Sequence, residues 1–207
     1  MKRTTERHSP DRVRTLEDRV TDSLHRFAYS IVKDHARRAD RLLEIGFGEG
    51  YGAAVVQPWV ASYVGVEVDA EAVSHANARY GADSVTFLEY DGATLPFDHA
   101  SFDLVISFQV VEHVQDPTAF LQEARRVARR GGAVLVTTPN RDHRLEDGER
   151  PWNRYHVREF SPPELEALLR AVFEDVEIFG IRGSPRMETI ERARVDRARK
   201  LARLDPL

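Results

Sequence analysis

The feature that most constrains this chain is a short apolar run that ends in alternating glycines. Residues 42–45 are followed by glycine at positions 46, 48, 50 and 52. Glycine takes positive φ angles without steric cost, and without a Cβ its main chain can approach a ligand closely. The run predicts a strand followed by a ligand-binding turn, with an ordinary glycine-rich turn as the plain alternative. A dinucleotide fingerprint needs glycine where Tyr51 stands, so a nicotinamide cofactor is the second choice.

Strand and helix patterns alternate after this turn. Strands are expected at residues 63–69, 85–90, 101–108, 133–138 and 175–180. A helix is expected from about residue 118 to residue 130, where Gly131 and Gly132 stop it, and Ser161 is expected to cap another. Such alternation is typical of a parallel sheet with helices on both faces. The fold class is therefore α/β.

The length of 207 residues favours one domain with terminal additions. Residues 1–12 are charged and expected to be loose, and residues 13–40 carry apolar side chains at helical spacing, as a covering helix would. The core is expected over residues 41–182. Residues 183–207 read as a basic helical tail, so no strand that would close the sheet after residue 180 is evident.

Acidic residues follow two of the expected strands. Glu67 ends the second strand, at the distance from the first glycine that one strand–helix–strand unit allows, where a carboxylate can accept hydrogen bonds from both ribose hydroxyls. Asp69 is expected to cap the next helix. Asp91 follows the third strand in an Asp-Gly pair, which is also common in solvated turns.

These motifs together closely resemble those of the class I S-adenosylmethionine-dependent methyltransferases, and in particular the small-molecule group that includes ubiquinone and menaquinone biosynthesis enzymes. The resemblance spans about residues 42–140 and rests on residues 44–50, 64–67, 91–97 and 102–107. It implies a Rossmann-like three-layer sandwich, a mostly parallel sheet of six or seven strands, and S-adenosyl-L-methionine as cofactor. It also implies that Asp91 faces the adenine amino group. The cofactor-binding positions it predicts are Glu44, Gly46, Phe47, Gly48, Gly50, Glu67, Val68, Asp91, Gly92, Phe108 and Gln109.

Two histidines are the candidates for catalysis. His113 follows the fourth strand, and His156 lies in an aromatic and charged loop after the fifth. Methyl transfer from a sulfonium depends largely on positioning, but a hydroxyl acceptor gains from a base that removes its proton. We expect transfer to a small-molecule hydroxyl oxygen, with His113 or His156 as base or substrate contact. Each histidine could instead serve only a structural hydrogen bond.

No metal site is predicted outright, although one set of residues is a candidate. The pair Glu112-His113 resembles part of a Glu-x-x-Glu-His metal motif of ubiquinone O-methyltransferases and small-RNA 2′-O-methyltransferases. Gln109 stands at the first position of that motif, and a neutral amide is a weaker ligand for a hard cation than a carboxylate. Glu112, His113 and His156 could still form a three-ligand site.

Composition narrows the alternatives. The formal net charge of −4 gives no overall basic field, so strong nonspecific nucleic-acid binding is not implied. The chain has no cysteine, which excludes thiolate chemistry, and no apolar run typical of a signal peptide or membrane span. We expect a cytoplasmic enzyme, with a homodimer allowed. The alternatives are a metal-assisted RNA 2′-O-methyltransferase and a noncatalytic cofactor-binding protein of the same fold.

Overall fold

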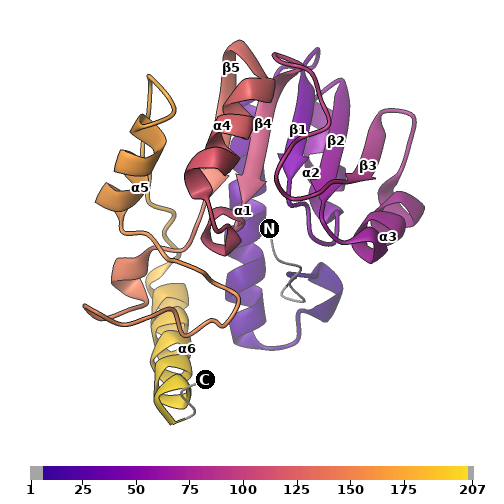
Figure 1. Cartoon of the computed structure of the whole chain (residues 1–207). Coiled ribbons are helices and arrows are strands. Elements are labelled where there is room, and N and C mark those ends of the chain that lie inside the picture. Colours follow the sequence, from indigo (N-terminus) through magenta and orange to yellow (C-terminus); the bar gives the residue numbers. More distant parts are fainter. Residues whose placement is uncertain (1–6, 205–207) are drawn as a thin grey trace.

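The computed structural model describes residues 7–204, and it contains a five-stranded parallel sheet between two layers of helices (Figure 1). The sheet order is β3-β2-β1-β4-β5. The strands are β1 (Arg41–Ile45), β2 (Ser62–Glu67), β3 (Val85–Glu89), β4 (Phe102–Phe108) and β5 (Ala128–Thr137). The strand order switches between β1 and β4, because β1, β2 and β3 run toward one edge of the sheet and β4 and β5 toward the other. Ligands of open α/β sheets bind at the carboxyl ends of the strands at such a switch point.

Helices connect and flank the strands. The α-helices are α1 (Leu16–His35), α2 (Tyr51–Val56), α3 (Ala70–Tyr80), α4 (Pro117–Val127), α5 (Pro162–Arg170) and α6 (Pro185–Leu204). Short 3-10 helices are η1 (Pro10–Arg12), η2 (Gln57–Trp59), η3 (Val111–His113) and η4 (Arg141–His143). None of the helices in residues 7–204 is both long and apolar enough to cross a membrane.

Strand alternation builds two cores, one on each face of the sheet. Leu42 on β1 and Tyr63 on β2 pack toward α1, α2 and α3. Leu43 and Val66, from the same two strands, pack toward α4 on the other face. All four side chains are fully buried, which is the pattern expected of central parallel strands that are covered on both faces. The α/β three-layer architecture expected from the sequence is therefore confirmed.

The helix starts follow from local capping. Asp69 accepts a hydrogen bond from the Glu71 amide at the start of α3, and Ser161 and Glu164 form a reciprocal capping box at the start of α5. Both caps were expected from the sequence, and they are confirmed. Each supplies an acceptor to amides that have no partner inside the helix.

The sheet has five strands rather than six or seven. Residues 175–180, expected to form a strand, have no regular structure, and Phe179 is 80% exposed. A strand needs a hydrogen-bonded neighbour, and the described chain continues into α6 instead of a closing strand. The helix expected to reach residue 130 ends at Val127, and Gly131 and Gly132 lie within β5 instead of stopping that helix.

The first and last described segments both pack against helices of the fold. The helix α6 lies beside α1, with Arg197 paired to Glu17 across them (Figure 1). The segment before α1 was expected to be loose, yet η1 forms and Asp11 pairs with Arg79 on α3. Residues 7–12 thus make defined contacts, whereas residues 1–6 and 205–207 lie outside the described part, so the looseness expected for residues 1–12 stays a prediction.

Candidate functional site

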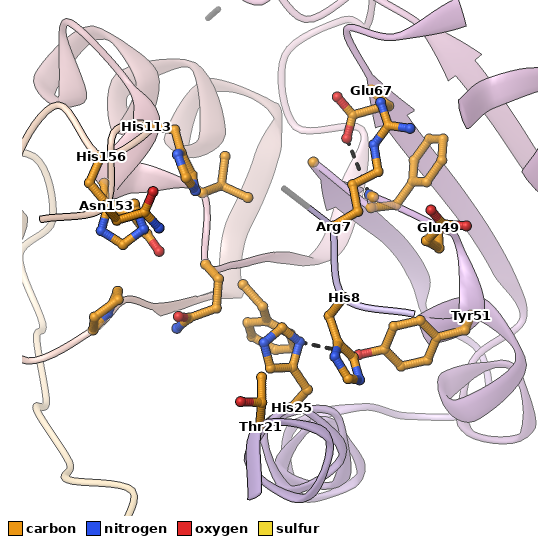
Figure 2. Close-up of a pocket in the computed structure, with 18 of the residues that line it drawn as sticks. Arg7, His8, Thr21, His25, Glu49, Tyr51, Glu67, His113, Asn153 and His156 are labelled. Carbon is orange, nitrogen blue, oxygen red and sulfur yellow. Dashed lines mark hydrogen bonds between the residues drawn. The ribbon is translucent and has the colours of Figure 1, made fainter. Parts of the chain in front are cut away.

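A cavity of about 360 Å³ opens where the carboxyl ends of β1, β2 and β4 meet (Figure 2). The glycine turn and Glu67 line one side, and His113, Asn153 and His156 line the opposite side. The helix α1 contributes Thr21, His25 and Tyr29 to its wall. The volume falls within the range of small-molecule sites.

The alternating glycines have different roles. Gly46, Gly48 and Gly50 all have positive φ, at 79°, 60° and 79°. A Cβ on Gly48 would meet no protein atom within 4 Å, so it would extend into open space where Gly48 lines the cavity. On Gly50 it would lie 2.7 Å from Ala76, so the absence of a side chain at Gly50 allows close packing against α3, and its expected cofactor contact stays a prediction. Gly46 and Phe47 line the cavity as expected.

Glu67 is the buried carboxylate of the glycine side. Its side chain accepts a hydrogen bond from the Gly48 amide at 3.2 Å and one from the Val68 amide at 2.8 Å. Burial raises the pKa of Glu67, and these two amides and the nearby Arg7 act in the opposite direction. The site thus holds a hydrogen-bond acceptor beside the glycine turn, where the ribose of the cofactor is expected from the sequence.

Glu44 lies beneath the cavity instead of lining it. Its two carboxylate oxygens accept hydrogen bonds from the Tyr29 hydroxyl at 2.6 Å and from the Tyr63 hydroxyl. Burial raises the pKa of Glu44 to about 7. Both oxygens are thus engaged by tyrosines, and a direct contact of Glu44 with the cofactor stays a prediction. Through Tyr29, which does line the cavity, Glu44 positions part of the wall.

Asp91 and Gly92 also lie outside the set of residues that line the cavity. Asp91 is exposed, and its Oδ1 accepts hydrogen bonds from the amides of Ala93 and Thr94, both at 2.8 Å. These backbone donors lower the pKa of Asp91. Asp91 thus has the turn role that the sequence left open, and its contact with adenine stays a prediction.

The remaining expected positions on the cofactor side do line the cavity. Val68 follows Glu67, Phe108 ends β4, and Gln109 follows it. Gln109 has a φ of 58°, and its main-chain N–H donates a hydrogen bond to the Thr137 carbonyl oxygen at 2.9 Å. A non-glycine residue at positive φ costs free energy, and such residues cluster at functional sites.

The two candidate histidines meet on the opposite side. Their ring centroids are 4.8 Å apart and their planes nearly perpendicular. The Nδ1 of His113 lies 3.0 Å from the Tyr155 carbonyl oxygen, which can only accept, so Nδ1 carries the proton. The Nδ1 of His156 lies 2.7 Å from the fully buried carboxylate of Glu159. In both rings Nδ1 is therefore the nitrogen that faces an acceptor from the surrounding protein.

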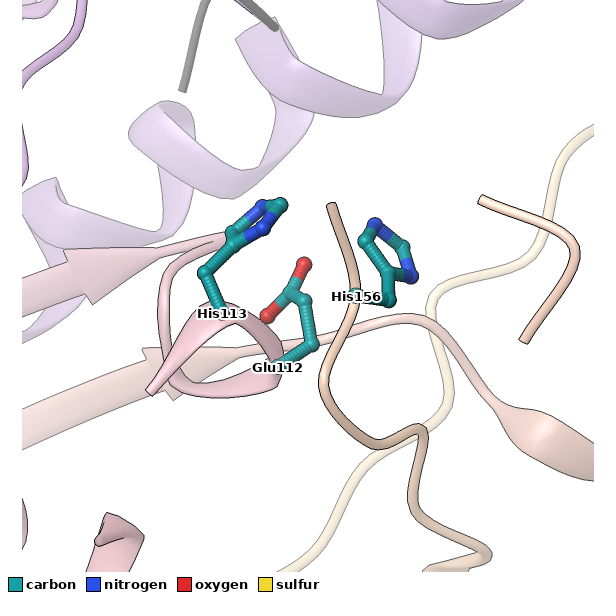
Figure 3. A group of neighbouring side chains, drawn as sticks. All are labelled: Glu112, His113 and His156. Atoms are coloured by element: carbon teal, nitrogen blue, oxygen red, sulfur yellow. The ribbon is translucent and has the colours of Figure 1, made fainter. Parts of the chain in front are cut away.

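Glu112 completes a potential metal-binding group with these histidines (Figure 3). One ligand atom from each of Glu112, His113 and His156 lies within 4.8 Å of the others. Glu112 accepts a hydrogen bond from the Thr138 hydroxyl at 3.0 Å, and burial raises its pKa to about 7. The donor set, one carboxylate and two imidazoles, suits a divalent transition metal better than magnesium.

Sequence reasoning missed several wall residues. Thr21, His25 and Tyr29 are four residues apart and share one face of α1, so their spacing could have revealed them. Arg144 binds Glu159 at 2.9 Å and stacks on Trp152 at 4.3 Å. No pattern in the sequence marks this second group, because its members come from an irregular loop.

Comparison with known proteins agrees with this geometry. A family model described as a methyltransferase domain matches residues 43–136. A probable S-adenosylmethionine-dependent methyltransferase of Mycobacterium tuberculosis is 36% identical over 168 residues, covering 81% of this chain and 60% of that protein. A fatty-acid O-methyltransferase of Mycolicibacterium smegmatis is 28% identical over 136 residues, covering 63% of this chain and 50% of that protein.

A solved structure extends the likeness to the fold. The YcgJ protein of Bacillus subtilis has a TM-score of 0.64 and 28% identity, covering 71% of this chain and 68% of that one. The chain belongs to the class I S-adenosylmethionine-dependent methyltransferases. The resemblance and the cofactor it implied are confirmed at the level of this class, while the ubiquinone and menaquinone subgroup stays a prediction. The chain spans 60% of the length of the mycobacterial relative.

Proposed function

We propose that this chain binds S-adenosylmethionine in the cavity and transfers its methyl group to an oxygen of a small-molecule acceptor. One observation carries the proposal. The glycine turn with Glu67 and the pair His113 and His156 line opposite sides of the same cavity. A cofactor half and an acceptor half therefore face each other, as an in-line displacement requires.

The cofactor half fits an adenosyl group. The space beside the Gly48 main chain is open, so a ligand can lie there. A side chain at position 48 would occupy that space. The buried carboxylate of Glu67 offers acceptors for ribose hydroxyls. Bound S-adenosylmethionine supplies a methyl group already activated by the sulfonium, so the remaining task of the protein is to place the acceptor and receive its proton.

The acceptor half supplies groups for that task. The acceptor oxygen forms a bond to the methyl carbon as the carbon–sulfur bond breaks, and the hydroxyl proton passes to Nε2 of His113 or His156. For His156, the buried carboxylate of Glu159 would stabilise the imidazolium that results. The mycobacterial fatty-acid O-methyltransferase supports oxygen as the acceptor atom, since its name states that chemistry.

A small molecule is favoured over RNA by the charges of the tail. Arg197, Arg199 and Arg203 on α6 pair with Glu17, Glu146 and Glu149. The positive charge of this helix is thus largely neutralised within the chain, whereas RNA binding relies on cations that face phosphates. The cytoplasmic location and a homodimer stay predictions from the sequence.

The cluster of Glu112, His113 and His156 supports a second candidate, a metal-assisted form of the transfer. In both histidines Nδ1 forms a hydrogen bond with an oxygen of the surrounding protein. Histidines that bind a metal through Nε2 usually have such a hydrogen bond at their other nitrogen. A bound metal would lower the pKa of the acceptor hydroxyl. Manganese titration of the wild type and of Glu112→Gln tests this form, and equal binding by both proteins contradicts it.

The proposal is tested by calorimetric titration with S-adenosylmethionine, S-adenosylhomocysteine and NAD, each with and without magnesium or manganese. Binding of the first two alone supports the cofactor assignment. Transfer of labelled methyl to hydroxylated acceptors, compared with their O-methylated counterparts, then tests the acceptor atom. A folded protein that binds NAD and neither sulfur compound contradicts the proposal.

A further inference from the structure

The segment just before α1 lies across the cavity. Arg7 and His8 both line it, Arg7 beside Glu67 and His8 beside Tyr51 (Figure 2). No motif of the family points to these residues, and the sequence predicted a loose terminus there. Their position raises the question of what holds the segment in place.

The segment is attached to α3 at both ends of that helix. Arg7 pairs with Asp69, the N-cap of α3, and Asp11 pairs with Arg79 in its last turn. These two partners are ten residues apart, so they are separated by about 15 Å along the helix axis. Residues 7–11 therefore run along α3 past the carboxyl end of β2.

A third contact attaches the segment to α1. The Nε2 of His8 lies 2.9 Å from Oδ1 of Asp22. The His8 ring also packs against His25 at 4.6 Å and against Tyr51 at 5.7 Å between centroids. The segment thus bridges α3 and α1, and α1 supplies Thr21, His25 and Tyr29 to the cavity wall.

The two ion pairs with α3 differ in exposure. The side chains of Arg7 and Asp69 are 18% and 16% exposed, whereas those of Arg79 and Asp11 are 46% and 58% exposed. Water screens the outer pair more strongly, so it is the weaker attachment. A segment with a firm inner contact and a weak outer one can open without unfolding either helix.

We infer that residues 7–12 form a strap that closes over the bound cofactor, with Arg7 as a positioning residue above the ribose at Glu67. The inference rests on the proposed function, because it assumes that the glycine side holds S-adenosylmethionine. Arg7 supplies a positive charge beside Glu67 and Asp69, so it keeps both carboxylates in place for the ligand. The strap must open for the cofactor to enter and for the product to leave.

The test measures affinity for S-adenosylhomocysteine by calorimetry and its release rate by rapid-mixing displacement. Arg7→Gln is expected to weaken binding and to speed release by about tenfold. Asp11→Arg places like charges together and is expected to speed release by a few fold, and Asp11→Arg with Arg79→Asp is expected to restore the wild-type rate. Arg12→Gln is the matched control, because Arg12 is exposed in the same segment and does not line the cavity.

Two further measurements separate the strap from a folding defect. Asp69→Asn keeps an N-cap side chain for α3 but removes the charge that Arg7 contacts, so it should reproduce the effect of Arg7→Gln. Amide hydrogen exchange of residues 7–12 should slow when S-adenosylhomocysteine is added. Wild-type release rates in Arg7→Gln, Asp69→Asn and Asp11→Arg would overturn the strap and leave the proposed function standing. Failure of the folded wild type to bind the ligand would overturn both.

Discussion

Tyr29 on α1 donates its hydroxyl to the carboxylate of Glu44 on β1 across 2.6 Å, and both side chains are buried. The bond joins the helix over the cavity to the strand beneath it. A Cβ on Gly52 would lie 2.3 Å from the Tyr29 ring, so this last glycine of the turn makes room for the tyrosine. The glycine run therefore serves both the ligand side of the turn and the docking of α1.

The Glu44 carboxyl predicts a pH dependence of stability. Burial raises its pKa from 4.5 in the unfolded chain to about 7, so the folded state binds the proton more tightly. The resulting stabilisation is present below the unfolded pKa and is lost as the pH rises through the folded pKa. At about 1.4 kcal/mol per pKa unit, the loss is on the order of 3 kcal/mol.

Glu44→Gln should remove this loss. Urea unfolding of the wild type and the variant at about pH 4.5 and about pH 8 measures it as the difference between the two proteins. Glu177→Gln, at an exposed carboxylate, is the control and should leave the wild-type dependence unchanged. Parallel stability curves for the wild type and Glu44→Gln would contradict the assignment.

Gly48→Val should abolish tight cofactor binding. The new side chain would extend into the cavity, and we expect affinity for S-adenosylhomocysteine to fall by about a hundredfold or more. Gly131→Val is the matched control, because Gly131 also has a positive φ and open space at its Cβ but lies outside the cavity lining. Both variants carry similar backbone strain, so equal affinities in the two would show that Gly48 does not border the ligand.

Glu67→Gln should weaken the same ligand by a smaller factor. The substitution keeps one oxygen acceptor but removes the charge, and a hydrogen bond to a charged group contributes about 1.5–3 kcal/mol. We therefore expect a loss of about ten- to a hundredfold in calorimetric affinity. Glu71→Gln changes an exposed carboxylate on α3 and should bind as the wild type does. An unchanged affinity in Glu67→Gln would remove this residue from the site.

Substitution of the catalytic histidine should lower turnover and leave cofactor binding unchanged. Replacement of the true base, His113 or His156, by alanine should lower methyl transfer to a hydroxyl acceptor by about 10²–10⁴-fold. His143→Ala, at an exposed position on η4, serves as the control. If both variants turn over as the wild type does, neither histidine is the base.

The fold was largely predictable because its signals are local. Apolar runs, the glycine turn and the caps at Asp69 and Ser161 each act within a few residues. The missing sixth strand was not predictable, because residues 175–180 have the alternation of a strand and lack only a partner. Pairing is a property of the whole sheet, and no local pattern encodes it.

The position of a site residue was predictable where the path of the main chain determines it. It was less predictable where other groups of the protein bind the side chain. Gly48, Glu67 and Gln109 line the cavity because each lies at or just after the carboxyl end of a strand. Glu44 and Asp91 carry acids in the expected motifs, but two tyrosines engage the first and its own turn engages the second. Such partners arise from tertiary packing and from turn geometry, which the motif alone does not contain.

The strand β5 is the terminal strand of the sheet, and it is twice as long as β3 at the other edge, with ten residues against five. Residues 133–137 are only half-buried. A long terminal strand presents main-chain donors and acceptors that a second molecule can pair with. If copies of this chain associate, as the sequence prediction of a homodimer allows, β5 is the strand at which we expect them to pair.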